Sequence, residues 1–128
     1  MSVSNSIGDE ALEHARSQLG QALSDLKSMG AIEDEIMEAR PAWVMPFEFV
    51  IGQTRRSALD VEFLWVIGGK LPIDCVHSNI AQTARDAARH FSLKWQLDAE
   101  RLGGTEAAKL VGFAEYLYSI VDNDDYWR

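Results

Sequence analysis

The chain has 128 residues, of which 47% are hydrophobic and 25% are charged, and its formal net charge is −8. This composition is typical of one globular domain, because it is too apolar and too weakly charged for intrinsic disorder. The excess of negative charge disfavours nucleic-acid binding, and no apolar run approaches the ~20 residues that cross a bilayer, so we expect no membrane partner.

The first predicted element is a helix that begins at Asp9 and ends near Gly30. Apolar residues recur along it at three- and four-residue spacing, and a glycine can adopt the left-handed conformation that closes a helix. Residues 31–39 space their apolar side chains for a second, short helix. Pro41 should stop that helix, because the residue before a proline avoids helical geometry.

Two strands are predicted next, over residues 47–54 and 61–67. In both, large apolar side chains alternate onto one face, as in a half-buried strand. The short polar connection between them favours an antiparallel hairpin. Residues 43–45 could add a third strand.

Two longer helices are predicted after a loop at residues 68–74. The first is capped by Ser78 or Asn79 and runs to Leu102, and the second is capped by Thr105. The predicted buried stripe of the first contains Ile80, Ala84, Ala87, Phe91, Trp95, Ala99 and Leu102, and that of the second contains Leu110, Ala114, Leu117 and Val121.

These elements predict an α+β fold, in which about four helices cover an antiparallel hairpin or a three-stranded sheet. The two C-terminal helices are expected to cover one face of that sheet. We expect a single domain over residues 1–128 with flexible ends at 1–7 and 122–128. Within residues 122–128, we expect Trp127 to pack onto the domain rather than to remain available to a binding partner.

The cytoplasm is the expected compartment. Cys75 is the only cysteine, which excludes an internal disulfide framework and fits a reducing environment. The N-terminal residues lack the basic and apolar regions of a signal peptide.

Three sequence elements stand out: a Trp-Val strand and a Gly-x-Leu-Pro-x-Asp turn within residues 65–74, and a Phe-Ser-Leu-Lys-Trp-Gln helix at 91–96. Together they resemble a family of small bacterial proteins catalogued as a domain of unknown function. The resemblance extends over roughly residues 40–102. It implies a bacterial origin and a soluble α+β fold, and it implies no activity and no catalytic residue.

The segment around Asp74, Cys75 and His77 is the first place to look for chemistry. With His90 these residues could be metal ligands, but structural zinc usually has four protein ligands, so we predict no metal site. A Cys-His nucleophile is equally disfavoured, because no oxyanion-hole signature accompanies it. Residues 68–70 lack the spacing of a phosphate-binding loop, so no cofactor is predicted either.

Asp74 has a structural explanation, since an aspartate at such a turn commonly accepts backbone hydrogen bonds. Arg85 and Arg89 lie one helical turn apart and could hold an anionic group, although such arginines more often pair with surface carboxylates. The weak candidates for ligand binding are therefore Asp74, His77, Arg85, Arg89 and His90.

Three functional hypotheses follow. The first is a non-enzymatic protein-interaction module or homodimer, favoured by many aromatic residues and no complete catalytic motif. The second is an acidic immunity- or inhibitor-type protein that neutralises a basic partner. The third is an enzyme or binder of a small anionic ligand that uses residues 74–90, which requires the five candidate side chains to converge on one pocket.

Overall fold

The computed structural model describes residues 8–36, 38–55 and 62–128. In order along the chain, the elements are α1 (Asp9–Ser28), β1 (Glu38–Met45), β2 (Phe49–Arg55), β3 (Leu64–Gly69), β4 (Asp74–His77), α2 (Ala84–Arg101), α3 (Gly104–Val121) and the 3-10 helix η1 (Asp124–Trp127). The strands form one antiparallel sheet in the order β1-β2-β3-β4. The predicted α+β class and the predicted hairpin of β2 and β3 are confirmed.

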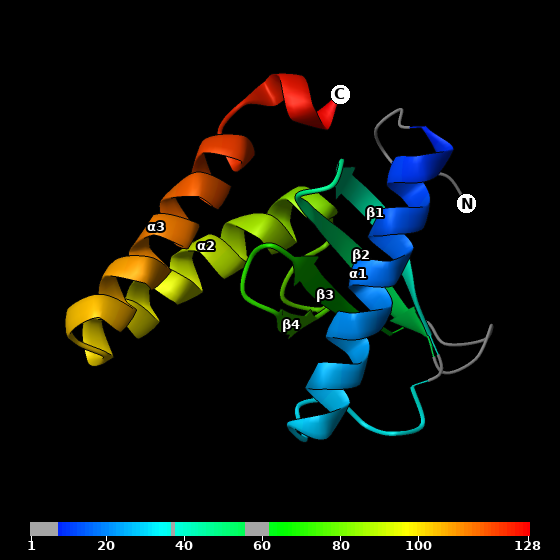
Figure 1. The fold of residues 1–128 in the computed structure, drawn as a ribbon, viewed down its shortest axis with the longest axis horizontal. Coiled ribbons are helices and arrows are strands. Elements are labelled where there is room, and N and C mark those ends of the chain that lie inside the picture. Colours follow the sequence, from blue (N-terminus) through cyan, green and yellow to red (C-terminus); the bar gives the residue numbers. More distant parts are fainter. Residues whose placement is uncertain (1–7, 37, 56–61) are drawn as a thin grey trace.

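The elements form three layers, with the sheet between helices (Figure 1). Helix α1 packs on one face, and the α2–α3 hairpin packs on the other. About four helices were expected, and the described parts of the chain contain three α-helices and the short η1. Both faces of the sheet are covered, and the two C-terminal helices share one face, as expected.

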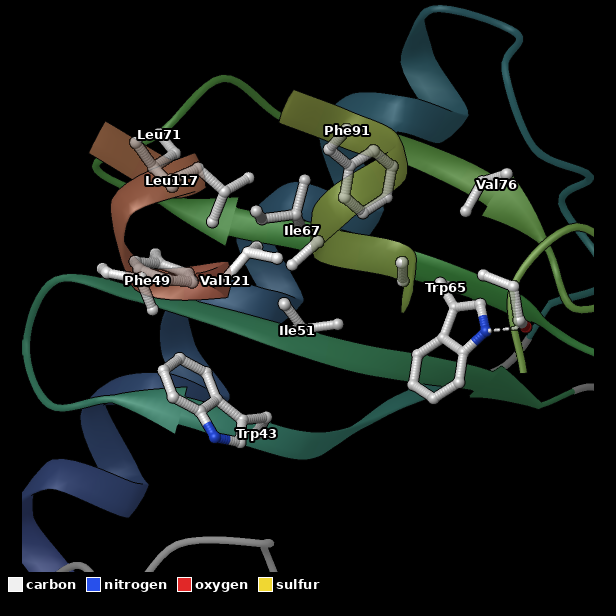
Figure 2. Packing of buried hydrophobic residues seen from close by; sticks show 14 of the residues in the cluster. Trp43, Phe49, Ile51, Trp65, Ile67, Leu71, Val76, Phe91, Leu117 and Val121 are labelled. Atoms are coloured by element: carbon white, nitrogen blue, oxygen red, sulfur yellow. Dashed lines mark hydrogen bonds between the residues drawn. The ribbon is translucent and has the colours of Figure 1, made fainter. Parts of the chain in front are cut away.

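Side chains of β2 and β3 alternate between these two layers. Ile51, Trp65 and Ile67 belong to the cluster under α2 and α3, which Figure 2 shows from close by. Their neighbours Val50 and Val66 belong to the cluster under α1. Every one of these five side chains is at most 2% exposed, so β2 and β3 are buried on both faces.

Small residues allow α1 to lie close to the sheet. A Cβ atom on Gly52 would lie 2.7 Å from the backbone oxygen of Arg40 and would also collide with Leu19 of α1. A Cβ atom on Gly68 would lie 2.7 Å from the Cβ of Ala22. These strand positions must therefore lack a side chain for α1 to be seated where it is.

The predicted short helix at residues 31–39 is wrong. Its described part makes only a turn, in which the N–H of Ile36 donates to the oxygen of Glu33 at 3.2 Å, and β1 begins at Glu38. A helix this short has little stability of its own, and burial of Ile32 and Ile36 against the α1 face decides the conformation instead. The possible third strand is thus confirmed as β1, and it is longer than expected.

A fourth strand was not predicted. Residues 75–77 were expected to be loop, but they form β4 with Asp74 and pair antiparallel with β3. Val76 completes the cluster on the α2–α3 side, and the partly buried Cys75 packs on the α1 side, as a small hydrophobic residue would. Four residues are too few for a clear alternation pattern in the sequence.

Both C-terminal helices begin differently from the prediction. Thr83, not Ser78 or Asn79, caps α2, and its side chain accepts a hydrogen bond from the N–H of Asp86. Helix α3 begins at Gly104 after Gly103, without a side-chain cap, so Thr105 lies inside the helix. The later start of α2 leaves Ile80 outside it and exposed.

The C-terminal residues pack on the domain. Trp127 stacks on Trp43 of β1 with ring centroids 4.4 Å apart, and its indole N–H donates to the oxygen of Ile120 at 2.9 Å. The indole N–H of Trp43 donates to the oxygen of Tyr126, also at 2.9 Å. The docking of Trp127 is confirmed, whereas flexibility elsewhere within residues 122–128 stays a prediction, and the expected flexible end at 1–7 lies outside the described residues.

Replacement of Trp127 tests how much this docking contributes. Trp127→Ala removes the stacked ring and leaves Trp43 uncovered, so we expect the free energy of unfolding to fall by about 2 kcal/mol. Tyr126→Phe is the matched control, because it keeps the backbone acceptor for Trp43 and should change stability by less than about 0.5 kcal/mol. Urea unfolding measures both, and an unchanged midpoint for Trp127→Ala would contradict a stabilising role.

Candidate functional site

Asp74 is the most densely bonded of the candidate residues. One carboxylate oxygen accepts from Nζ of Lys94 at 2.6 Å and from the indole N–H of Trp95 at 3.1 Å. The other accepts from the N–H of Cys75 at 2.8 Å. The predicted backbone hydrogen bond to Asp74 is confirmed. Two further hydrogen bonds come from Lys94 and Trp95 of α2, so Asp74 joins β4 to that helix.

The charges around this cluster favour a structural ion pair. Burial alone would lower the pKa of Lys94, but its hydrogen bond with Asp74 and the charges of Asp74 and Asp98 outweigh burial and raise that pKa. Burial, with a contribution from Asp74, raises the pKa of the Cys75 thiol. A nucleophilic cysteine needs the opposite shift, so this thiol is not activated.

His77 lies on the other side of β4. It is three residues from Asp74, an odd number, so the two side chains point to opposite faces of the sheet. Nδ1 of His77 accepts from the N–H of Asn79 at 3.1 Å, and Nε2 lies 3.5 Å from a carboxylate oxygen of Glu62. His77 lines a cavity of about 460 Å³ near the C-terminal end of α1.

Arg85 holds the C-terminal segment in place. Its Nε donates to the oxygen of Val121 at 2.9 Å, its Nη2 donates to Asp124 at 2.7 Å, and its guanidinium carbon lies 5.9 Å from the centre of the Trp127 ring. The hydrogen bond from Arg85 lowers the pKa of the Asp124 carboxyl. Arg85 therefore binds an anion that belongs to the chain itself.

Arg89 and His90 complete the set of candidates. Arg89 donates to Asp86 at 3.0 Å. Pairing with a surface carboxylate is the alternative that the sequence analysis favoured over ligand binding. His90 is half-buried and its ring lies 6.0 Å from that of its neighbour Phe91.

The structure does not bring the five candidates to one pocket. Asp74 and His77 occupy opposite faces of the sheet, and Arg85 lies nine residues before Lys94 on α2, a distance of about 14 Å along the helix. The geometry therefore gives no support to a shared anion site. Within the described residues, no group of three His, Cys, Asp or Glu side chains is placed to hold a metal ion.

A different feature, the projecting end of the α2–α3 hairpin, was missed from the sequence. We call residues 93–113 the hairpin tip; it extends beyond the sheet in Figure 1. Its side chains contribute little to the sheet core beyond Trp95 and the partly buried Leu110. The exposed large apolar residues of the tip are Leu93, Leu97, Leu102, Val111 and Phe113.

A signal for this surface was present in the sequence. Leu93 and Leu97 fall on the side of α2 opposite to the predicted stripe of Phe91 and Trp95, so a helical projection would have exposed them. Leu102 was assigned to the buried stripe but is 50% exposed, because α2 ends beyond the sheet. Sequence periodicity shows which side of a helix is apolar, but not at which residue the helix extends beyond the elements that bury that side.

In the parts of the chain that are described, no helix is both long and apolar enough to cross a membrane.

Replacement of Asp74 tests the junction between β4 and α2. Asp74→Asn removes the charge that binds Lys94, so we expect the free energy of unfolding to fall by about 2 kcal/mol. Asp98→Asn is the matched control, since Asp98 lies farther from the same Lys94, at 3.7 Å, and is more exposed than Asp74, so the change should cost less than about 0.5 kcal/mol. Equal urea midpoints for the two variants would show that Asp74 has no special role.

Comparison with known proteins supports the resemblance seen in the sequence. The family model described as "Domain of unknown function (DUF4826)" matches residues 9–127. No curated protein and no solved structure matches the chain. The match includes α1 and η1, which the three sequence elements did not reach. Since it covers nearly the whole sequence, the chain belongs to the DUF4826 family.

Proposed function

We propose that this protein is a self-associating interaction module, and that two copies pack through their α2–α3 hairpins. The observation that carries the proposal is the exposure of the first half of α3. Residues 104–113 contain no buried side chain, although they include Leu110, Val111 and Phe113. This half of an apolar helix is thus only partly covered by its own chain, with Ala107 and Leu110 half-buried.

The exposed residues form stripes suited to helix packing. Leu93 and Leu97 are four residues apart on α2, and Val111 and Tyr118 are seven residues apart on α3, spacings that place each pair on one side of its helix. These four residues, which we call the hairpin stripe, are between 36% and 59% exposed. A monomeric domain usually presents polar side chains on such surfaces.

A second copy is the partner that the charges favour. Three acids and three bases balance within the hairpin tip, whereas the whole chain has a net charge of −8. Two acidic copies can approach one another through a neutral surface without strong repulsion. A basic partner, as an inhibitor-type protein would have, gains nothing from this neutral tip.

Geometry also suits a pair of hairpins. Two hairpins packed against each other form a four-helix bundle, in which each apolar stripe covers its equivalent across a two-fold axis. Each helix has 18 residues and is about 27 Å long, so a hairpin about 20 Å wide offers about 500 Å² per copy. The total of about 1,000 Å² is at the lower end for a specific interface, so we expect a weak dimer.

The sheet edges are poorer candidates for association. Edge strand β1 contains Pro41 and an irregular register between Pro41 and Trp43, and edge strand β4 has only four residues. Proline, bulges and short length all hinder pairing with another strand. The hairpins therefore offer the better contact.

A reducing compartment, the cytoplasm of a bacterium, is part of the proposal. It is supported by the single, partly buried Cys75, whose raised pKa keeps the thiol protonated.

Sedimentation over a range of protein concentrations tests the self-association. The chain mass is 14.3 kDa, so a dimer doubles it. We expect the average mass to rise toward that value as concentration approaches about 1 mM. Leu97→Glu and Val111→Glu should each hold the protein nearer the monomer mass, because they place a charge in the apolar contact.

Ile80→Glu is the control for these variants. Ile80 is 61% exposed and lies outside the hairpin, so the change adds the same charge away from the proposed contact and should leave the mass profile unchanged. A mass of 14.3 kDa at every concentration would refute self-association. An equal effect of Ile80→Glu would show that net charge alone governs it.

A further inference from the structure

The cavity beside His77 lies in a different layer from the hairpin. It is a half-open hollow between the connection that follows α1 and the ends of β2, β3 and β4, and its volume is about 460 Å³. Gly30, with φ of 74°, turns the chain at the end of α1, and the N–H of Ala31 donates to the oxygen of Leu26 at 2.9 Å. This turn directs residues 31–36 across the end of the sheet to make one wall.

The walls of the cavity combine apolar and polar side chains. Ile32 and Ile36 come from the connection, and the half-buried Leu64 comes from β3. Thr54 of β2 is 3% exposed, and its hydroxyl oxygen accepts from the N–H of Leu64 at 2.9 Å. A volume of a few hundred Å³ with such a lining is typical of a small-molecule site.

Glu62 gives the rim of the cavity a negative charge. Its side chain is 74% exposed, and none of the described lining residues is a lysine or arginine. The C-terminal end of α1 adds the negative end of a helix dipole beside Gly30. The Asn79 N–H bond to Nδ1 leaves the proton of a neutral His77 ring on Nε2, which faces Glu62.

We propose that this cavity binds a small organic amine. The apolar body of the ligand lies against Ile32, Ile36 and Leu64, and its ammonium group lies at the rim beside Glu62. The negative charge at the rim repels anionic ligands, which are the class of ligand that Arg85 and Arg89 had suggested. The site is independent of the hairpin, so the two proposals can fail separately.

Titration with 2-phenylethylammonium, compared with 3-phenylpropionate, tests the proposal. The two probes share an aromatic body and differ in the sign of their charge. We expect the amine to raise the melting temperature and to shift the amide NMR signals of Ile32, Leu64 and His77, and the carboxylate to do neither. Equal binding of both probes, or no binding of the amine, would overturn the proposal.

Two charge-matched variants locate the ammonium group. Glu62→Gln should weaken binding of the amine about tenfold, because it removes the exposed carboxylate at the rim without disturbing the core. Glu106→Gln makes the same change in net charge at the start of α3, far from the cavity in sequence and layer, and should leave the affinity unchanged. An equal loss in both variants would show a non-specific effect of charge and would also overturn the site.

Discussion

The sheet carries side chains of different size on its two faces, and this constraint decides where each helix can lie. On the α2–α3 face, β2 and β3 present Ile51, Trp65 and Ile67, which fill a thick layer beneath two helices. On the α1 face they present valines and the two glycines, Gly52 and Gly68, so a single helix can lie close. The order of large and small residues along two adjacent strands therefore specifies a three-layer arrangement.

The tryptophans attach further segments to this arrangement. Each buries an apolar ring and must find an acceptor for its indole N–H, so it fixes the backbone or side chain that supplies the acceptor. The acceptors are the oxygen of Tyr126 for Trp43, the oxygen of Ala81 for Trp65, the carboxylate of Asp74 for Trp95 and the oxygen of Ile120 for Trp127. The connection before α2, strand β4 and the C-terminal segment are thus held by the same physical requirement.

Sequence periodicity predicted α1, the β2–β3 hairpin, and the inner stripe of α3, because each contains enough residues for a repeat to be read. It failed for residues 31–39 and for β4, where burial of a few side chains against distant elements outweighs local preference. The candidate site residues were chosen by chemical type, and their separation depends on strand parity and on helix length, which set Asp74 apart from His77 and Arg85. The cavity involves segments far apart in sequence, so no local pattern indicates it.

The two surfaces proposed for binding differ in how they arise from the fold. The cavity lies where the connection from α1 to β1 passes the ends of β2, β3 and β4. The hairpin tip exists because α2 and α3 continue after the sheet ends, so their apolar residues lose cover. The hollow and the exposed stripe therefore belong to opposite layers of the fold. A ligand in the hollow contacts neither α2 nor α3, so we expect its binding and the pairing of hairpins to be uncoupled unless the sheet between them moves.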